Sequence, residues 1–182
     1  MNTNTQHVLK LVLSAVCLAL CLVLPFLTGQ IPEIGSMLCP MHIPVLLCGL
    51  LCGPWWAAAV GAIAPILRSA TLHMPPMFPT AVAMAFELAA YGLLAGLALR
   101  LLPCRKPWNV YAALLIAMVG GRIVWGLVSA VLHGIAHTEF GWSAFVAGAV
   151  TNAVPGIALH LLLIPVIVLA LERALPWLKP SR

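Results

Sequence analysis

The stretch RSATLHMPPMFPTAVAMAFELAAYGLLAGLALR (68–100) decides how this chain folds. Its first part is a Pro-rich loop, and its second part is an apolar segment long enough to cross a bilayer as a helix. One carboxylate, Glu87, lies inside that segment. An ionisable group in the middle of a membrane helix is costly, so it marks a functional site by default. Glu87 is therefore the first candidate for a binding residue.

The composition of the whole chain points the same way. Of its 182 residues, 63% are hydrophobic and only 7% are charged, whereas soluble domains carry roughly 25% charged residues. We therefore expect one integral-membrane domain over residues 1–182, all-α and polytopic. The formal net charge of +5 is attributed to Lys and Arg in cytoplasmic loops and not to nucleic-acid binding.

The hydrophobic runs divide the chain into spans. The first covers 8–28, an outer loop covers 29–40, and later spans cover about 80–101, 109–133 and 143–171.

Residues 41–69 allow two interpretations. They form either two short helices, about 38–52 and 54–69, with a turn at Gly53-Pro54, or one Pro-kinked span over about 45–67. Six transmembrane helices with cytoplasmic N- and C-termini place seven loop cations inside and only Arg68 outside. Five spans with the N-terminus outside would place six cations inside and two outside. The positive-inside rule therefore favours six spans, with five spans as the alternative.

The helix over 80–101 has two different faces. Glu87 and Tyr91 share one stripe at helical spacing, and small residues occupy roughly the opposite face: Ala85, Ala89, Gly92 and Gly96. That second face includes a GxxxG pattern, which permits close contact between membrane helices. One face is therefore expected to pack and the other to present polar groups.

Polar residues on the next two spans reach a similar depth. Arg122, Trp125 and Ser129 share a stripe on the fifth span, and Asn152 lies in the sixth. At 1.5 Å per residue, Glu87, Arg122 and Asn152 lie roughly 10, 16 and 14 Å from the outer ends of their helices. This predicts an outward-facing pocket. The alternatives are a structural Arg122–Glu87 ion pair and an Asn152 side chain that only tethers helices.

Several other residues could carry chemistry. Arg68 at the outer rim is either a counter-charge for an anion or a headgroup anchor. Six cysteines show no CxxC spacing and fit small packing residues, with Cys39 ambiguous. The strings MLCPMH (37–42) and HMPPM (73–77) contain soft ligands without a repeated spacing, so neither a metal nor a cofactor is expected. No GxxxxGK[ST] loop and no clear buried nucleophile is present, which argues against an ATPase and against an enzyme.

Taken together, these segments resemble the substrate-binding S components of energy-coupling factor (ECF) transporters. The resemblance rests on the short six-span layout, on LRSATLHMPPMFPTAVAMAFELAAYGLLAGL (67–97) and on GAVTNAVPGIALHLLLIPVIV (148–168). It implies a multi-pass protein of a prokaryotic cell membrane that captures a micronutrient, in general a water-soluble vitamin, from outside. It also implies partners that drive ATP-dependent uptake, namely a transmembrane coupling subunit and two cytoplasmic ATPase subunits.

The resemblance assigns roles to particular residues. Ala15 and Ala19 form an AxxxA pattern on the first span, where the family contacts its coupling subunit. Nickel and cobalt components of the family begin with a Met-His pair, whereas Met41-His42 is internal here, which counts against a metal substrate.

Two alternatives to this function remain open. One is a self-sufficient small permease or channel, and the other is a membrane enzyme with a nucleophile near His133. The choice of substrate also stays open. An anionic vitamin such as pantothenate or folate suits Arg68 and Arg122, and an aromatic one such as riboflavin suits Trp125, Tyr91 and Phe78.

Overall fold

The structure, a computed structural model, describes residues 3–27, 38–102, 107–135, 141 and 154–174. The described chain forms six α-helices and one π-helical turn, η1 (Met77–Ala81), and it contains no strand. The helices are α1 (Thr3–Leu27), α3 (His42–Leu51), α4 (Pro54–Leu72), α5 (Val82–Leu101), α6 (Pro107–Ile135) and α8 (Val154–Ala174). The prediction of an all-α polytopic membrane protein is confirmed.

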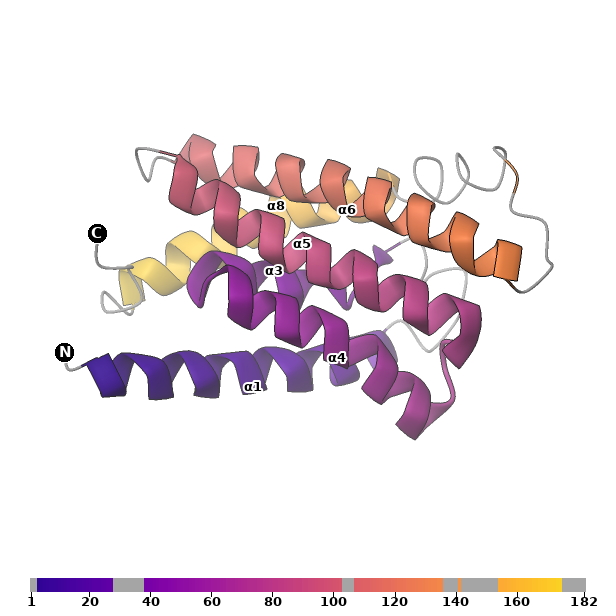
Figure 1. Ribbon diagram of the computed structural model, residues 1–182. Coiled ribbons are helices and arrows are strands. Elements are labelled where there is room, and N and C mark those ends of the chain that lie inside the picture. The colour runs from indigo at the N-terminus through magenta and orange to yellow at the C-terminus, as the bar shows by residue number, and fades with distance from the viewer. Residues whose placement is uncertain (1–2, 28–37, 103–106, 136–140, 142–153, 175–182) are drawn as a thin grey trace.

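The long helices run side by side along one axis, and α1 begins at the end of the bundle where α8 ends (Figure 1). Five of them are long and apolar enough to cross a membrane: α1, α4, the η1–α5 segment, α6 and α8. The helix α3 has ten residues, which rise about 15 Å, and this is about half of the hydrocarbon thickness of a bilayer. Membrane-spanning helices therefore enclose one short inner helix.

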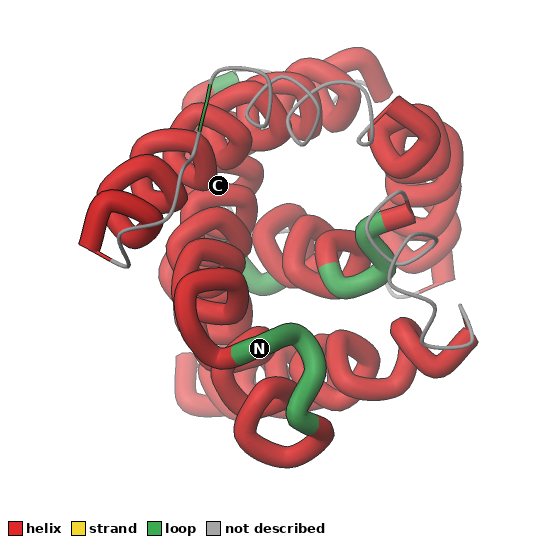
Figure 2. Tube along the Cα trace, turned by 90° about the vertical axis from the view of Figure 1, so that its right-hand side faces the viewer, coloured by secondary structure: helices red, strands yellow, loops and turns green. Residues whose placement is uncertain are grey.

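The short helix α3 is the centre of the bundle. All ten of its residues are buried, and it contacts α1, α4, α5 and α8. The view along the bundle shows the other helices arranged around it (Figure 2). Its composition, with Ile43, Val45, Leu46 and Leu47 among five consecutive residues, fits a helix that is buried on every side. The start of α3 is thus held inside the protein.

The two-helix interpretation of residues 41–69 is confirmed, and the single Pro-kinked span over 45–67 is wrong. The break has a local cause at Gly53, whose φ of +106° is a conformation that residues with a Cβ rarely adopt. Pro54 follows at the first position of α4, where the lack of an N–H costs nothing. The chain therefore turns sharply between α3 and α4 and does not continue as one helix.

The other predicted boundaries are close to the observed ones. The first span begins earlier than expected, at Thr3, and the fifth extends to 107–135. In the fourth, η1 replaces the first turn of the expected helix. The predicted sixth span began at 143, and its residues 143–153 lie outside the described residues, with α8 described from Val154.

The small-residue face of α5 packs as predicted. A Cβ added to Gly92 would come within 2.7 Å of Ala57 on α4, and one added to Gly96 would come within 2.5 Å of the Pro54 nitrogen. A Cβ added to Gly49 of α3 would likewise come within 2.7 Å of the Gly92 carbonyl oxygen. Because three backbones meet here, this face of α5 is filled, and the Glu87 stripe turns toward the interior near α6.

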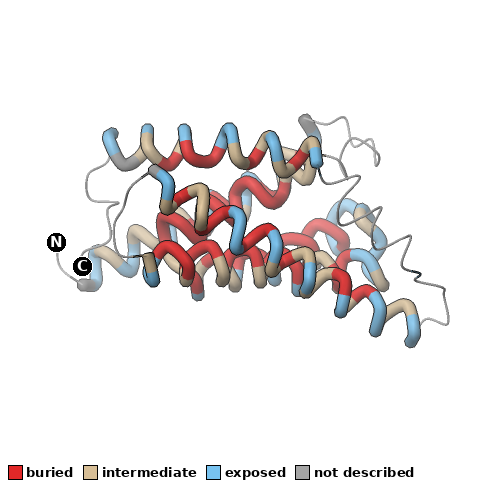
Figure 3. Tube along the Cα trace, turned by 90° about the horizontal axis from the view of Figure 1, so that it is seen from above, coloured by how far each residue is buried: buried red, intermediate tan, exposed pale blue. Residues whose placement is uncertain are grey.

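The outward surface of the bundle is apolar. Seen from above, buried residues concentrate on the inward sides of the helices and exposed ones on the periphery (Figure 3). On α6, for example, Val119, Ile123 and Leu127 are 61%, 53% and 65% exposed. Such continuous apolar exposure is unusual for a soluble monomer and is the surface that lipid contact requires.

Candidate functional site

The centre of the site is an ion pair between α5 and α6. Arg122 Nη1 lies 3.0 Å from Glu87 Oε1, and Glu87 is only 2% exposed. Two glycines directly before Arg122 allow this approach. A Cβ on Gly120 would collide with Leu94, and one on Gly121 would collide with the Tyr91 ring. The local sequence GGR thus brings α6 against α5 and aims the guanidinium at the carboxylate.

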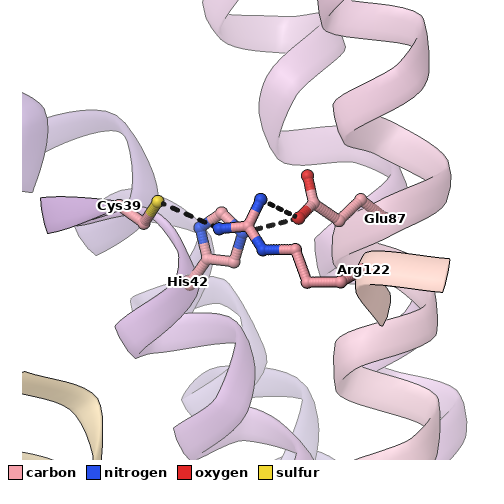
Figure 4. A network of polar contacts seen from close by, with 4 residues as sticks. All are labelled: Cys39, His42, Glu87 and Arg122. Atoms are coloured by element: carbon pink, nitrogen blue, oxygen red, sulfur yellow. Dashed lines mark hydrogen bonds and ion pairs between the residues drawn. The ribbon is translucent and has the colours of Figure 1, made fainter. Parts of the chain in front are cut away.

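A histidine from the short central helix completes the contact. His42 Nε2 lies 3.5 Å from the same carboxylate oxygen, Glu87 Oε1. The His42 ring also meets Tyr91 edge to face, with 4.8 Å between centroids. His42 is 3% exposed and Tyr91 is 1% exposed, so the cluster is in the protein interior. Figure 4 shows Glu87 facing both His42 and Arg122.

The guanidinium of Arg122 has further neighbours. Its Nη2 donates to Cys39 Sγ at 3.7 Å (Figure 4), and its Cζ lies 6.0 Å from the centre of the Trp125 ring. Cys39 precedes α3 and has a positive φ of 47°. Thiols are weak acceptors, so the main partner of Arg122 among the described residues is Glu87.

A second histidine enters from α8. The rings of His160 and His42 are stacked, with centroids 6.0 Å apart and planes 21° from parallel. His160 is 3% exposed. The site thus draws on four helices, α3, α5, α6 and α8, together with Cys39.

Several buried polar atoms of the cluster make no hydrogen bond to any residue that the structure describes. They are His42 Nδ1 and Nε2, Glu87 Oε1, Arg122 Nε and His160 Nε2. For Glu87 Oε1 the two contacts above are therefore ionic and not aligned hydrogen bonds. Buried polar groups in proteins are nearly always hydrogen-bonded, and leaving one unpaired costs about 1–3 kcal/mol. A cluster of such atoms within one interior region is suited to binding a polar solute.

Glu87 and Arg122 are in contact, as the ion-pair alternative has it, and Tyr91 and Trp125 lie beside them. The outward-facing pocket stays a prediction. Ser129 is 2% exposed on α6. Asn152, the third member of the predicted layer, lies outside the described residues.

Arg68 is engaged elsewhere. Its Nε donates to the Met74 carbonyl oxygen at 3.0 Å and its Nη1 to the Leu22 carbonyl oxygen at 3.1 Å. Its Cζ lies 5.7 Å from the Phe26 ring centre. Although charged, Arg68 is only 5% exposed. It therefore ties the end of α4 to the end of α1 and to the segment before η1. Its predicted contact with substrate stays a prediction.

Three residues of the cluster were missed by sequence reasoning: Cys39, His42 and His160. The available signal was polar side chains in apolar runs, MHIPVLLCGL (41–50) and ALHLLLIPV (158–166). In the sequence, His42 stood out only as one of the possible soft-metal ligands in MLCPMH (37–42). Among the described residues, no group of three or more His, Cys, Asp or Glu side chains is arranged to hold a metal ion.

Two further predictions concern other parts of the chain. Cys17, Cys21, Cys48 and Cys52 are buried in the core, which fits their interpretation as small packing residues. His133 Nδ1 lies 2.8 Å from the Ser129 carbonyl oxygen on its own helix. Ala15 and Ala19 are exposed on α1.

Comparison with known protein families gives a match. A family model described as "ECF transporter, substrate-specific component" matches residues 9–168, which is most of the chain. Comparison with curated proteins and with solved structures found no match.

Proposed function

The chain belongs to the family of ECF transporter substrate-specific components, and from this premise we propose that it captures a micronutrient, expected to be a water-soluble vitamin, in the Glu87–Arg122 site. Members of this family are substrate-binding transport subunits and not enzymes. The protein is accordingly a multi-pass membrane protein that associates with other ECF components.

The observation that carries the proposal is the buried cluster itself. A carboxylate, a guanidinium and two imidazoles converge from α3, α5, α6 and α8, where a lipid-facing charge would be costly. Four of their nitrogen atoms make no hydrogen bond among the described residues. A purely structural ion pair would be expected to satisfy these atoms, so their open hydrogen-bonding capacity favours a site that binds a solute.

Each residue of the site has a proposed role. Glu87 and Arg122 hold each other and present the remaining guanidinium N–H groups to the solute. Trp125 and Tyr91 form aromatic walls, and Ser129 and Asn152 supply further polar contacts. Arg68, whose donors contact two carbonyl oxygens, is assigned mainly to positioning the segment before η1 over the site.

Uptake requires partners that the chain does not contain. We propose a transmembrane coupling subunit, which contacts Ala15 and Ala19 on α1, and two cytoplasmic ATPase subunits that supply the energy. The solute enters from the outer side of a prokaryotic cell membrane, at the end of the bundle where α4 and α6 end. The N- and C-termini face the cytoplasm.

The test is solute binding by the purified chain without its partners. We expect one small solute to co-purify and to be identified by mass spectrometry, and Glu87→Gln and Arg122→Ala each to weaken its binding at least tenfold in calorimetry. Breaking a buried pair also destabilises a protein by about 3–5 kcal/mol, so thermal unfolding is measured in parallel, and a variant is compared only where it remains folded.

The matched control is Phe86→Leu. Phe86 adjoins Glu87 on α5 but is 56% exposed, so binding is expected to stay unchanged. Unaltered binding in both site variants would remove the Glu87–Arg122 assignment. Solute flux through vesicles containing the chain alone would instead favour a self-sufficient permease.

A further inference from the structure

We propose that the substrate of this site carries no net charge at neutral pH and presents a planar, nitrogen-containing aromatic ring. This inference rests on the proposed function, because it names the class of solute that the same site would take.

The charge of Arg122 is balanced within the protein. Its guanidinium lies 3.0 Å from Glu87 Oε1, and both side chains are in the interior, 15% and 3% exposed. The positive charge is therefore already balanced. A bound anion would have to compete with Glu87 at short range, or would leave a buried net negative charge, which is costly in a medium of low dielectric constant.

Arg68, the other described Arg near this end of the bundle, is already engaged by the backbone. Two of its donor nitrogens bind the carbonyl oxygens of Leu22 and Met74, and its guanidinium lies beside Phe26. An anion that recruited Arg68 would break both hydrogen bonds and release the α1–α4 tether. Arg68 therefore serves the fold and not as a counter-charge.

The remaining charges of the described residues lie at the opposite end of the bundle. Arg100 and Arg173 lie in the last turns of α5 and α8, and Lys10 lies in the first half of α1, so all three belong to the opposite end of the bundle (Figure 1). The connecting segments 28–37 and 136–153 contain no Lys or Arg by sequence, whereas each contains one Glu. Among the described residues, no Lys or Arg other than Arg68 and Arg122 lies at this end of the bundle to balance an anionic substrate.

The imidazoles do not change this balance. His42 and His160 stack 6.0 Å apart, and the oxygen that His42 faces is already paired with Arg122. Tyr91 and Cys39 are the other polar groups that the described residues bring to this cluster. The fixed charges of the cluster among the described residues are those of Glu87 and Arg122, and they balance each other.

The groups of the cluster favour a flat solute. The open hydrogen-bonding atoms, His42 Nδ1 and Nε2, Arg122 Nε and His160 Nε2, all belong to planar groups, and aromatic rings of Tyr91 and Trp125 adjoin them. A flat heteroaromatic solute offers in-plane donors and acceptors together with faces that stack on such groups. An aliphatic solute of the same polarity would not use the aromatic surfaces.

The experiment uses three probes built on the same pyridine ring: nicotinamide, which is uncharged, nicotinate, an anion, and 1-methylnicotinamide, a cation. Their dissociation constants for the purified full-length chain are measured by ligand-observed NMR titration. We expect nicotinamide to bind at least tenfold more tightly than either charged probe.

Charge variants then test the cause of this order. Glu87→Gln leaves Arg122 unopposed, so the preference should move at least tenfold toward nicotinate. Arg122→Gln leaves Glu87 unopposed, and the preference should move toward 1-methylnicotinamide. Arg100→Gln removes the same charge from an exposed position at the opposite end, and it should leave the order unchanged.

The inference is overturned if nicotinate binds the unmodified chain as tightly as nicotinamide, if the order does not respond to the two site variants, or if none of the three probes binds. These failures differ from failure of the proposed function. An anionic solute that co-purifies with the chain would contradict the inference and leave the transport function standing, whereas a chain that retains no solute and supports no uptake would contradict the function itself.

Discussion

Glu87 illustrates how far one residue can be understood from sequence. Its position inside an apolar run already indicated an interior site, and Arg122 was the natural partner because neither charge tolerates lipid. The contact of His42 with Glu87 could not be predicted in the same way. A neutral histidine in an apolar run is ambiguous, and its contact with Glu87 depends on where α3 begins. The charged pair was thus one of two interpretations that the sequence allowed, whereas the imidazoles could be placed only from the fold.

Arg68 leads to a prediction about stability. Arg68→Ala removes the donors to the Leu22 and Met74 carbonyl oxygens. Loss of two hydrogen bonds from a buried charged group should lower the free energy of unfolding by about 3–6 kcal/mol, at about 1.5–3 kcal/mol for each bond. Thermal unfolding of the purified protein in detergent measures this change.

The control for Arg68 is Thr71→Ala. Thr71 is exposed, and its hydroxyl donates to carbonyl oxygens of its own helix, so its loss should be nearly neutral. If Arg68→Ala instead left stability unchanged and abolished solute binding, Arg68 would be a substrate ligand as the sequence first suggested, and its tethering role would be rejected.

At the scale of helices, the small-residue face of α5 was predictable because Gly and Ala at helical spacing have few other uses in a membrane. The position of α3 was not. A ten-residue apolar helix and one half of a kinked span have the same composition, and the difference is decided by the positive φ of Gly53.

The packing of α4 on α5 makes a second stability prediction. A Cβ on Gly61 would collide with the Leu88 backbone of α5. Because backbone atoms have little freedom to move aside, Gly61→Ala should separate the helices and destabilise the protein by about 1–3 kcal/mol, as overpacking does. The midpoint of thermal unfolding should fall accordingly.

Gly134 provides the matched control for this glycine. It is also helical, on α6, but an added Cβ meets nothing within 4 Å. Gly134→Ala should therefore leave stability unchanged or raise it slightly, since alanine is favoured over glycine in helices by up to about 1 kcal/mol. Equal effects of the two substitutions would contradict the close-contact interpretation of the α4–α5 interface.

At the scale of the whole molecule, the interior and the exterior have separate tasks. The interior holds the polar cluster, and the periphery is apolar over most helices. On α1 the exposed surface includes Ala15 and Ala19, between larger exposed residues such as Val12, Val16 and Leu20. A pair of small residues one turn apart forms a shallow depression that suits close approach by another helix.

This surface separates solute binding from coupling in an experiment. Ala15→Trp and Ala19→Trp fill the depression with large side chains far from Glu87 in the fold's interior. We expect ATP-dependent uptake by the assembled transporter to fall at least tenfold, because the coupling subunit can no longer approach α1 closely. Solute binding by the isolated chain should change less than twofold.

Val119→Trp, at an exposed position on α6, places the same bulk on another surface and should leave uptake intact. Uptake that survives both alanine substitutions would move the coupling contact away from this face of α1, and loss of binding in the isolated chain would show that the substitutions act through the fold.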